Sequence, residues 1–60
     1  MTFKEAKQLH NGDEITIKET GEIVTVISAY TDYVGDKLKA FVEVYSSDYG
    51  YTTLSHTEIR

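Results

Sequence analysis

From Glu14 onward, the spacing of the apolar residues changes to a period of two. This pattern constrains the fold more than any other feature. Ile15 and Ile17 alternate with polar neighbours, and the period of two returns in Leu38, Ala40, Val42 and Val44. A period of two is typical of β-strands that bury one face. The sequence therefore predicts a mainly β fold, with strands at about 14–19, 22–30, 38–45 and 51–54.

The residues before the first strand follow a different period. Apolar residues recur at helical spacing from Phe3 to Leu9. Thr2 and Glu5 have the spacing of a capping box, in which each side chain bonds the backbone N–H of the other residue. We therefore expect one short helix at about 3–9. A helix of this length is not stable alone, so it must pack on the sheet.

Two connections and a terminal turn complete the pattern. Residues 31–37 contain two aspartates and a glycine and predict a loop, and residues 46–50 predict a hairpin turn. Ser55 and Glu58 have the spacing of a second capping box, which predicts a 3₁₀ turn at about 55–59.

The 60 residues allow a single domain, 1–60. The chain has no cysteine, so neither disulfides nor thiolate metal sites stabilise it. A domain of this size buries only about 60 % of the surface that its unfolded chain exposes, so its stability depends on a small apolar core. Predicted core positions are Phe3, Ala6, Leu9, Ile15, Ile17, Val24, Val26, Leu38, Ala40, Val42, Val44, Leu54 and Ile59, with Ile23, Ile27 and Phe41 on a second, partly covered face.

The second predicted strand is apolar on both sides. Strict alternation places Val24, Val26 and Ser28 on one face and Ile27 and Ala29 on the other. We therefore expect a central strand that is covered on each side.

Two segments resemble a small SH3-like β-barrel. They are Gly12-Asp13-Glu14-Ile15-Thr16-Ile17, a Gly-Asp entry to the first strand, and Gly21-Glu22-Ile23-Val24-Thr25-Val26-Ile27, a tight turn before a strongly apolar strand. The ending from Thr53 to Ile59 is similar to the 3₁₀ turn that precedes the last strand of such barrels. The chain as a whole also resembles the very small uncharacterised proteins of phages and prophages of Gram-positive bacteria.

This resemblance implies an SH3-like barrel, or a strongly bent antiparallel sheet, of four to five strands with one short N-terminal helix. It implies no catalytic residues. An SH3-like barrel has five strands, whereas only Ile59 and Arg60 remain here for the fifth. Three outcomes stay open: a vestigial last strand, an open sheet, or a sheet that a partner chain completes.

No group of residues has the pattern of an active site. Ser55 and His56 are neighbours, but a catalytic serine needs a histidine that a carboxylate orients in space. Asp32, Asp36 and Asp48 meet only if their two connections share one end of the barrel, and no calcium-loop spacing is present. Each glycine is isolated, so there is no phosphate-binding loop. We expect no enzymatic activity and no catalytic, cofactor-binding or metal-binding residues.

The chain lacks cysteine, and its N-terminal segment is too polar for a secretion signal. No apolar run approaches the roughly 20 residues of a membrane span. We therefore expect a cytoplasmic protein without membrane contact.

Five tyrosines in 60 residues point to a contact surface. Tyr33 and Tyr49 fall at predicted loop tips, where core packing is difficult, so we expect them to contact a partner. Tyr30, Tyr45 and Tyr51 are further candidates, although they can instead pack over the barrel ends. These observations favour a non-enzymatic protein-interaction module, such as a phage-derived accessory or host-targeting protein. Its partner is another protein or, through pairing of edge strands, a second copy of the chain.

A nucleic-acid-binding module of the SH3-like or KOW type is the alternative. Lys37 and Lys39 lie near several tyrosines, and aromatic platforms with cations bind single strands. However, the chain has 6 basic and 10 acidic residues and a net charge of −4, which repels a polyanion. The sequence therefore favours a protein partner over nucleic acid.

Overall fold

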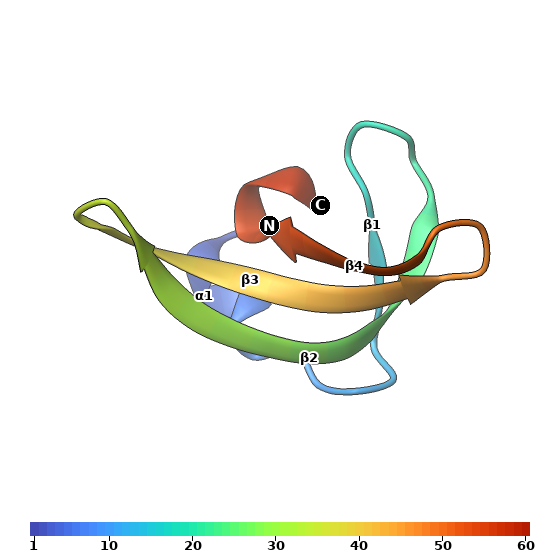
Figure 1. Ribbon diagram of the computed structural model, residues 1–60, viewed down its shortest axis with the longest axis horizontal. Coiled ribbons are helices and arrows are strands. Elements are labelled where there is room, and N and C mark those ends of the chain that lie inside the picture. Colours follow the sequence, from blue (N-terminus) through green and yellow to red (C-terminus); the bar gives the residue numbers. More distant parts are fainter.

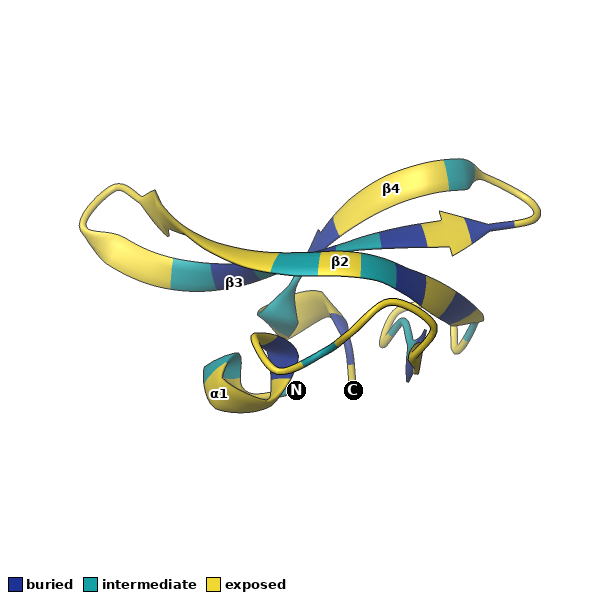
Figure 2. Cartoon of the chain, turned by 90° about the horizontal axis from the view of Figure 1, so that it is seen from below, coloured by how far each residue is buried: buried dark blue, intermediate teal, exposed yellow.

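The computed structural model describes residues 1–60 and confirms the mainly β fold (Figure 1). All four strands are antiparallel, and strands that follow each other in sequence are neighbours in the sheet. The sheet curls into a half-barrel, and both short helices lie on its concave side (Figure 2). The elements in chain order are α1 (Phe3–Ala6), β1 (Glu14–Thr16), β2 (Ile23–Val34), β3 (Lys37–Ser46), β4 (Gly50–Ser55) and the 3₁₀ helix η1 (His56–Glu58).

The C-terminal residues partly close the half-barrel. Ile17 and Ile59 form an isolated antiparallel bridge, flanked by backbone hydrogen bonds of 2.9 and 3.0 Å. The ammonium group of Met1 donates to the carbonyl oxygen of Ile59, which brings the two termini together. Two of the three outcomes left open for a fifth strand are combined here: Ile59 forms a vestigial one-residue bridge, and the four-stranded sheet itself stays open between β1 and β4.

The core lies on the concave face of the sheet, beneath α1 and the C-terminal turn. All of its nine buried residues were predicted, while Phe3, Leu9 and Ile17 are partly buried against it. The prediction for Leu38 is wrong, because this side chain is 44 % exposed. The buried residues are Ala6, Ile15, Val24, Val26, Ala40, Val42, Val44, Leu54 and Ile59.

The helix is shorter than predicted, ending at Ala6 instead of continuing to residue 9. Its capping box is confirmed: the Glu5 N–H donates to Thr2 Oγ1 over 3.2 Å, and the Thr2 N–H donates to Glu5 Oε1 over 3.1 Å. The predicted second capping box is wrong. Ser55 makes no capping bond to η1, and its hydroxyl pairs with that of Thr57 at 2.7 Å.

The first strand ends at Thr16 instead of residue 19, since the chain turns immediately afterwards. Ile17 N–H donates to the carbonyl of Glu22 over 2.9 Å, and the N–H of Gly21 donates back to Ile17 over 2.8 Å. Gly21 has a φ of 75°, a backbone conformation that residues with a side chain rarely adopt. These bonds commit residues 18–21 to a turn.

The loop predicted at 31–37 is wrong, because β2 and β3 continue as a paired ribbon to a two-residue turn. Val34 pairs with Lys37, and only Gly35 and Asp36 remain between them. Gly35 has a φ of 68° and no other turn residue has a positive φ, which is the pattern of a type II′ hairpin turn. We call residues 31–39 the arm. It projects from the half-barrel, and none of its residues is buried (Figures 1 and 2).

The strict alternation expected within β2 is also wrong. A β-bulge at Ile27 interrupts the ladder, so that Val26 pairs with Val44 while Ala29 pairs with Val42. Residues that pair directly across antiparallel strands lie on the same face. The bulge therefore keeps both Val26 and Ala29 on the core side and turns Ser28 to the opposite side.

Candidate interaction surface

The convex side of the sheet is covered by no helix or loop (Figure 2). We call this surface the outer face and define it by the cross-strand pairs that share it. Its residues are Thr25, Ser28, Tyr30, Asp32 and Val34 of β2, Lys37, Lys39, Phe41, Glu43 and Tyr45 of β3, and Tyr51, Thr53 and Ser55 of β4.

Aromatic residues form two pairs on the outer face. Tyr30 of β2 stacks on Phe41 of β3, with ring centroids 5.7 Å apart and an angle of 27° between the rings. Tyr45 of β3 packs against Tyr51 of β4 at 5.1 Å with a tilt of 45°. Such pairs hold each ring in a fixed orientation while leaving its outer surface in water.

A polar row separates the two aromatic pairs. Ser28 pairs with Glu43, and Glu43 pairs with Thr53, so these three residues follow one line across β2, β3 and β4. The outer face therefore has small and acidic side chains in its centre and aromatic rings on either side along the strands.

The structure assembles a different set of tyrosines from the one that the sequence favours. Tyr30, Tyr45 and Tyr51 share the outer face and are 47 %, 45 % and 72 % exposed. They do not pack over barrel ends. Tyr33 and Tyr49, expected at loop tips, are exposed, and neither belongs to the cross-strand pairs that define the outer face.

Tyr33 is a strand residue that pairs with Leu38, and this pair lies on the face of the arm opposite to the outer face. Tyr49 lies in the β3–β4 turn. Phe41 was expected on the second, partly covered face, and its intermediate burial agrees with that, but sequence reasoning did not include it among the contact residues. The parity that Phe41 shares with Glu43 and Tyr45 along β3 is the signal that places it on the outer face.

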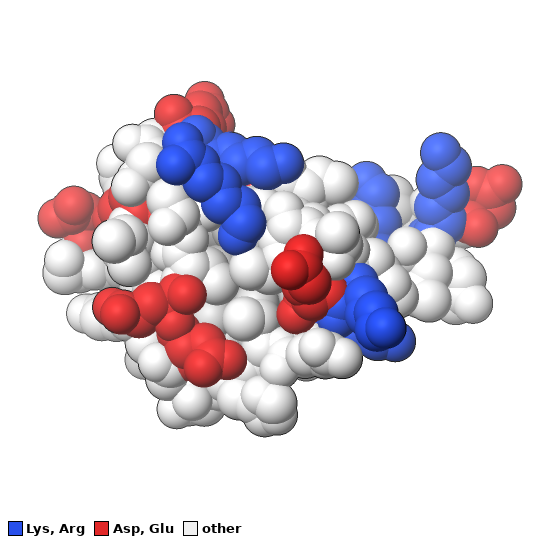
Figure 3. Space-filling view, turned by 180° about the vertical axis from the view of Figure 1, so that it is seen from behind, with Lys and Arg blue, Asp and Glu red and all other residues white.

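Both lysines of the nucleic-acid alternative lie on the outer face. Lys39 pairs with Asp32, and Lys37 pairs with Val34 near the tip of the arm. They occupy one end of the surface, beyond the Tyr30–Phe41 pair, and an acidic residue sits directly opposite one of them. On the side of the molecule seen in Figure 3, acidic and basic groups form separate small clusters instead of a continuous basic stripe.

The three aspartates considered for metal binding do not meet. Asp32 and Asp36 belong to the arm, whereas Asp48 lies in the β3–β4 turn at the opposite end of the molecule (Figure 1). The two connections therefore do not share one end of the half-barrel, which is the condition under which these aspartates would meet. No group of three or more His, Cys, Asp or Glu side chains is arranged to hold a metal ion.

His56 has structural partners instead of a catalytic one. Its Nδ1 atom accepts from the N–H of Ala40 over 3.4 Å, where β3 extends beyond the end of β4. Its ring packs edge-on against Phe3 at 5.9 Å. The hydroxyl of Ser55 bonds to Thr57, so Ser55 and His56 do not form a nucleophile–base pair.

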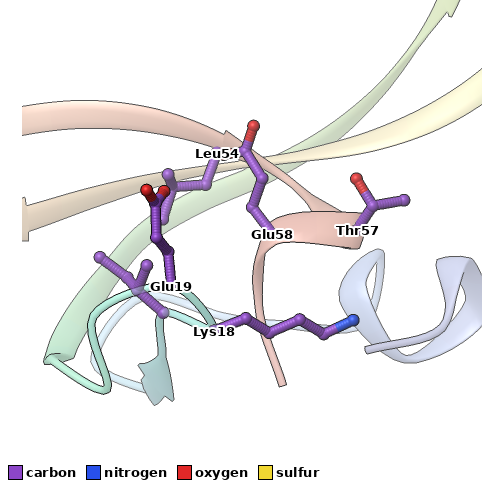
Figure 4. A pocket seen from close by; sticks show the side chains of 6 residues that line it. Lys18, Glu19, Leu54, Thr57 and Glu58 are labelled. Atoms are coloured by element: carbon purple, nitrogen blue, oxygen red, sulfur yellow. The ribbon is translucent and has the colours of Figure 1, made fainter.

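One pocket of about 380 Å³ lies where the half-barrel stays open (Figure 4). It is bounded by the chain after β1, by the end of β4 and by η1. Its charged residues have both signs, and it contains neither a histidine nor any of the predicted site residues. The lining residues are Ile17, Lys18, Glu19, Leu54, Thr57 and Glu58.

The free edge of β4 is the second feature that a partner can use. β4 pairs only with β3, and no backbone hydrogen bond outside the sheet ladders involves Gly50–Ser55. The segment Gly-Tyr-Thr-Thr-Leu-Ser contains neither a charged residue nor proline, which are the usual guards of an edge strand.

Neither helix has the length and hydrophobicity that a membrane crossing requires. Comparison with known proteins found no matching family model, curated protein or solved structure.

Proposed function

We propose that this protein is a non-enzymatic protein-interaction module that binds its partner through the outer face. The observation that carries the proposal is the uncovered sheet surface with its two aromatic pairs, Tyr30–Phe41 and Tyr45–Tyr51. Aromatic residues are enriched at protein interfaces, and exposed apolar patches of this kind mark interaction sites. Because each ring is already held by its neighbour, binding costs little further side-chain entropy.

The charge of the chain favours a basic partner. A net charge of −4 attracts positively charged surfaces and repels acidic ones, which steers encounters. A phage-derived protein that occupies a basic surface of a host protein fits this charge, in line with the resemblance of the whole chain to small phage proteins.

The test is an unbiased selection of binding peptides from a display library, followed by mapping with matched variants. We expect the selected peptides to lose at least tenfold in affinity against Tyr45→Ser, which removes one ring of the outer face. Tyr49→Ser, in the β3–β4 turn, is the control and should bind like the wild type. Selected peptides that bind both variants equally well would contradict the proposal.

Binding of single-stranded nucleic acid is the second candidate. The position of Lys37 and Lys39 beside the stacked Tyr30 and Phe41 favours it, since bases stack on aromatic rings next to cations. An amide NMR titration with single- and double-stranded oligonucleotides at low salt decides this point. Shifts at the outer face that salt reverses support nucleic acid, and a silent titration eliminates it.

The free edge of β4 suits a second copy of the chain. Antiparallel pairing about Thr52 joins Tyr51 to Thr53 of the second copy and brings no like charges together. Sedimentation equilibrium should then show a mass that rises with concentration, and Thr53→Lys should keep the chain monomeric. A constant monomer mass at all concentrations eliminates this mode.

A further inference from the structure

Glu43 is a half-buried carboxylate at the centre of the outer face. Its direct neighbours across the sheet are Ser28 and Thr53, both uncharged. No hydrogen bond of the structure involves its carboxylate. The centre of the surface therefore carries one negative charge that the protein itself leaves without a partner.

The cations on the same face are too far away to neutralise Glu43. Lys39 and Lys37 stand four and six residues earlier on β3, which places their backbones about 13 and 20 Å away at roughly 3.3 Å per residue. Asp32, by contrast, has Lys39 directly opposite. The outer face thus has two acidic residues, Asp32 and Glu43, and only Glu43 has no basic residue directly opposite it.

Aromatic rings flank Glu43 on both sides along the strand. Phe41 and Tyr45 are its nearest neighbours on the same side of β3, each about 7 Å away along the backbone. Each ring is fixed by its own partner, Tyr30 or Tyr51. Ser28 and Thr53 are small, so they leave the carboxylate accessible between the aromatic pairs.

A carboxylate between aromatic rings is complementary to a flat cation. A guanidinium group can donate two hydrogen bonds to a carboxylate and stack on aromatic faces at the same time. An ammonium group is a more strongly hydrated point charge and gains less from the rings. Cation–π contacts form within about 6 Å of a ring centroid, a distance that a side chain seated on Glu43 can reach.

We propose that Glu43, together with Phe41 and Tyr45, binds an arginine side chain of a protein partner. This inference rests on the proposed function and adds the chemistry that the partner presents. Charge complementarity identifies the ligand of this site. An unpaired carboxylate between aromatic rings, on a chain with a net charge of −4, attracts a cationic side chain.

The experiment is an amide NMR titration of the full chain with a capped Gly-Arg-Gly peptide. The capped citrulline counterpart, which has the same shape without the charge, is the ligand control. We expect saturable shifts centred on Ser28, Phe41, Glu43 and Tyr45 with the arginine peptide and none with the citrulline peptide. Glu43→Gln should weaken binding about tenfold, since it removes a charge-assisted hydrogen-bond pair.

Two further variants separate the outcomes. Glu19→Gln makes the same change of charge away from the outer face and should bind within twofold of the wild type. Tyr45→Leu keeps an apolar side chain but removes the ring. It should weaken binding of the arginine peptide, whereas the citrulline peptide should give no shifts with this variant either. Equal shifts with citrulline, or unchanged affinity in Glu43→Gln, would overturn the inference. If the arginine site fails this test while display-selected peptides still require Tyr45, the proposed function stands without the arginine site. If the selected peptides do not require Tyr45 either, the proposed function fails together with the arginine site.

Discussion

The side-chain amide of Asn11 donates a 3.1 Å hydrogen bond to the carbonyl oxygen of Ile27, sixteen positions later in the chain. Ile27 is the bulged residue of β2, and a bulge leaves one residue without its ladder partner. The amide of Asn11 supplies a partner from outside the sheet. Because the bulge turns Ser28 and Tyr30 outward, this bond between loop and strand also supports the outer face.

Asn11→Ala should therefore lower the free energy of unfolding by about 0.5–1 kcal/mol, the net value of one exposed hydrogen bond. Urea unfolding measures the change. Gln8→Ala, an exposed substitution before the loop, is the control and should have almost no effect. Equal stability of the two variants would show that Asn11 does not support the bulge.

Ser46 joins two turns at one end of the sheet. Its buried hydroxyl donates to Glu22 Oε2 over 2.7 Å and accepts from the N–H of Asp48 over 3.2 Å. Ser46→Ala should cost about 1–2 kcal/mol, because it removes both bonds from a site with little access to water. A double-mutant cycle with Glu22→Ala isolates the bond between the two side chains. Additive effects in that cycle would mean that the two side chains are not coupled.

The fold could be predicted from the sequence wherever local pattern decides it. All four strands were located, β1 and β3 by period-two alternation and β2 by its apolar run, and the capping box of Thr2 and Glu5 located the helix start. The pattern failed at Ile27, because a bulge depends on partners that lie far away in the chain. It failed again at the arm, where polar composition outweighed the strand-forming Tyr33 and Val34 although two residues suffice for the turn.

The candidate surface was less predictable than the core. The tyrosines were predicted to be contact residues, but their grouping depends on which face each strand presents. The bulge shifts Tyr30 relative to Val26, and the cross-strand register sets Tyr51 beside Tyr45. Glu43 gives no signal in the sequence, since its isolation from cations becomes visible only through its neighbours Ser28 and Thr53.

The arm should be dispensable for folding. Removing Asp32 and Tyr33 together with their partners Lys39 and Leu38 keeps the register and the parity of both strands. None of these residues is buried, so the free energy of unfolding should change by no more than about 1 kcal/mol. Circular dichroism and urea unfolding of the shortened chain measure this. Loss of cooperative unfolding would show that the arm stabilises the half-barrel.

An introduced aspartate should unfold the domain on the concave face of the sheet and be tolerated on the outer face. Val42→Asp puts an unpaired charge into the core, where Val42 is fully buried, and should unfold the domain. Thr53→Asp places the same side chain on the outer face and should leave a cooperative melt. A folded Val42→Asp variant would contradict the assignment of the concave face as the core.

Glu5 should give the protein a small stabilisation that acid removes. The Thr2 backbone N–H and, in addition, the Thr2 hydroxyl donate to its carboxylate and hold the pKa of Glu5 below the ordinary value of 4.5. A lowered pKa in the folded state means that the stabilisation is present above about pH 4.5 and is lost as pH falls through the folded value.

Glu5→Gln tests this sign, because glutamine can accept the same bonds but does not titrate. We expect the wild type to melt at a higher temperature than Glu5→Gln near neutral pH. The difference should shrink as pH falls below 4.5 and disappear once Glu5 is protonated. It should be small throughout, because this carboxylate is exposed and solvent screens its charge. A difference that grows on acidification would mean that the capping bonds do not favour the ionised form.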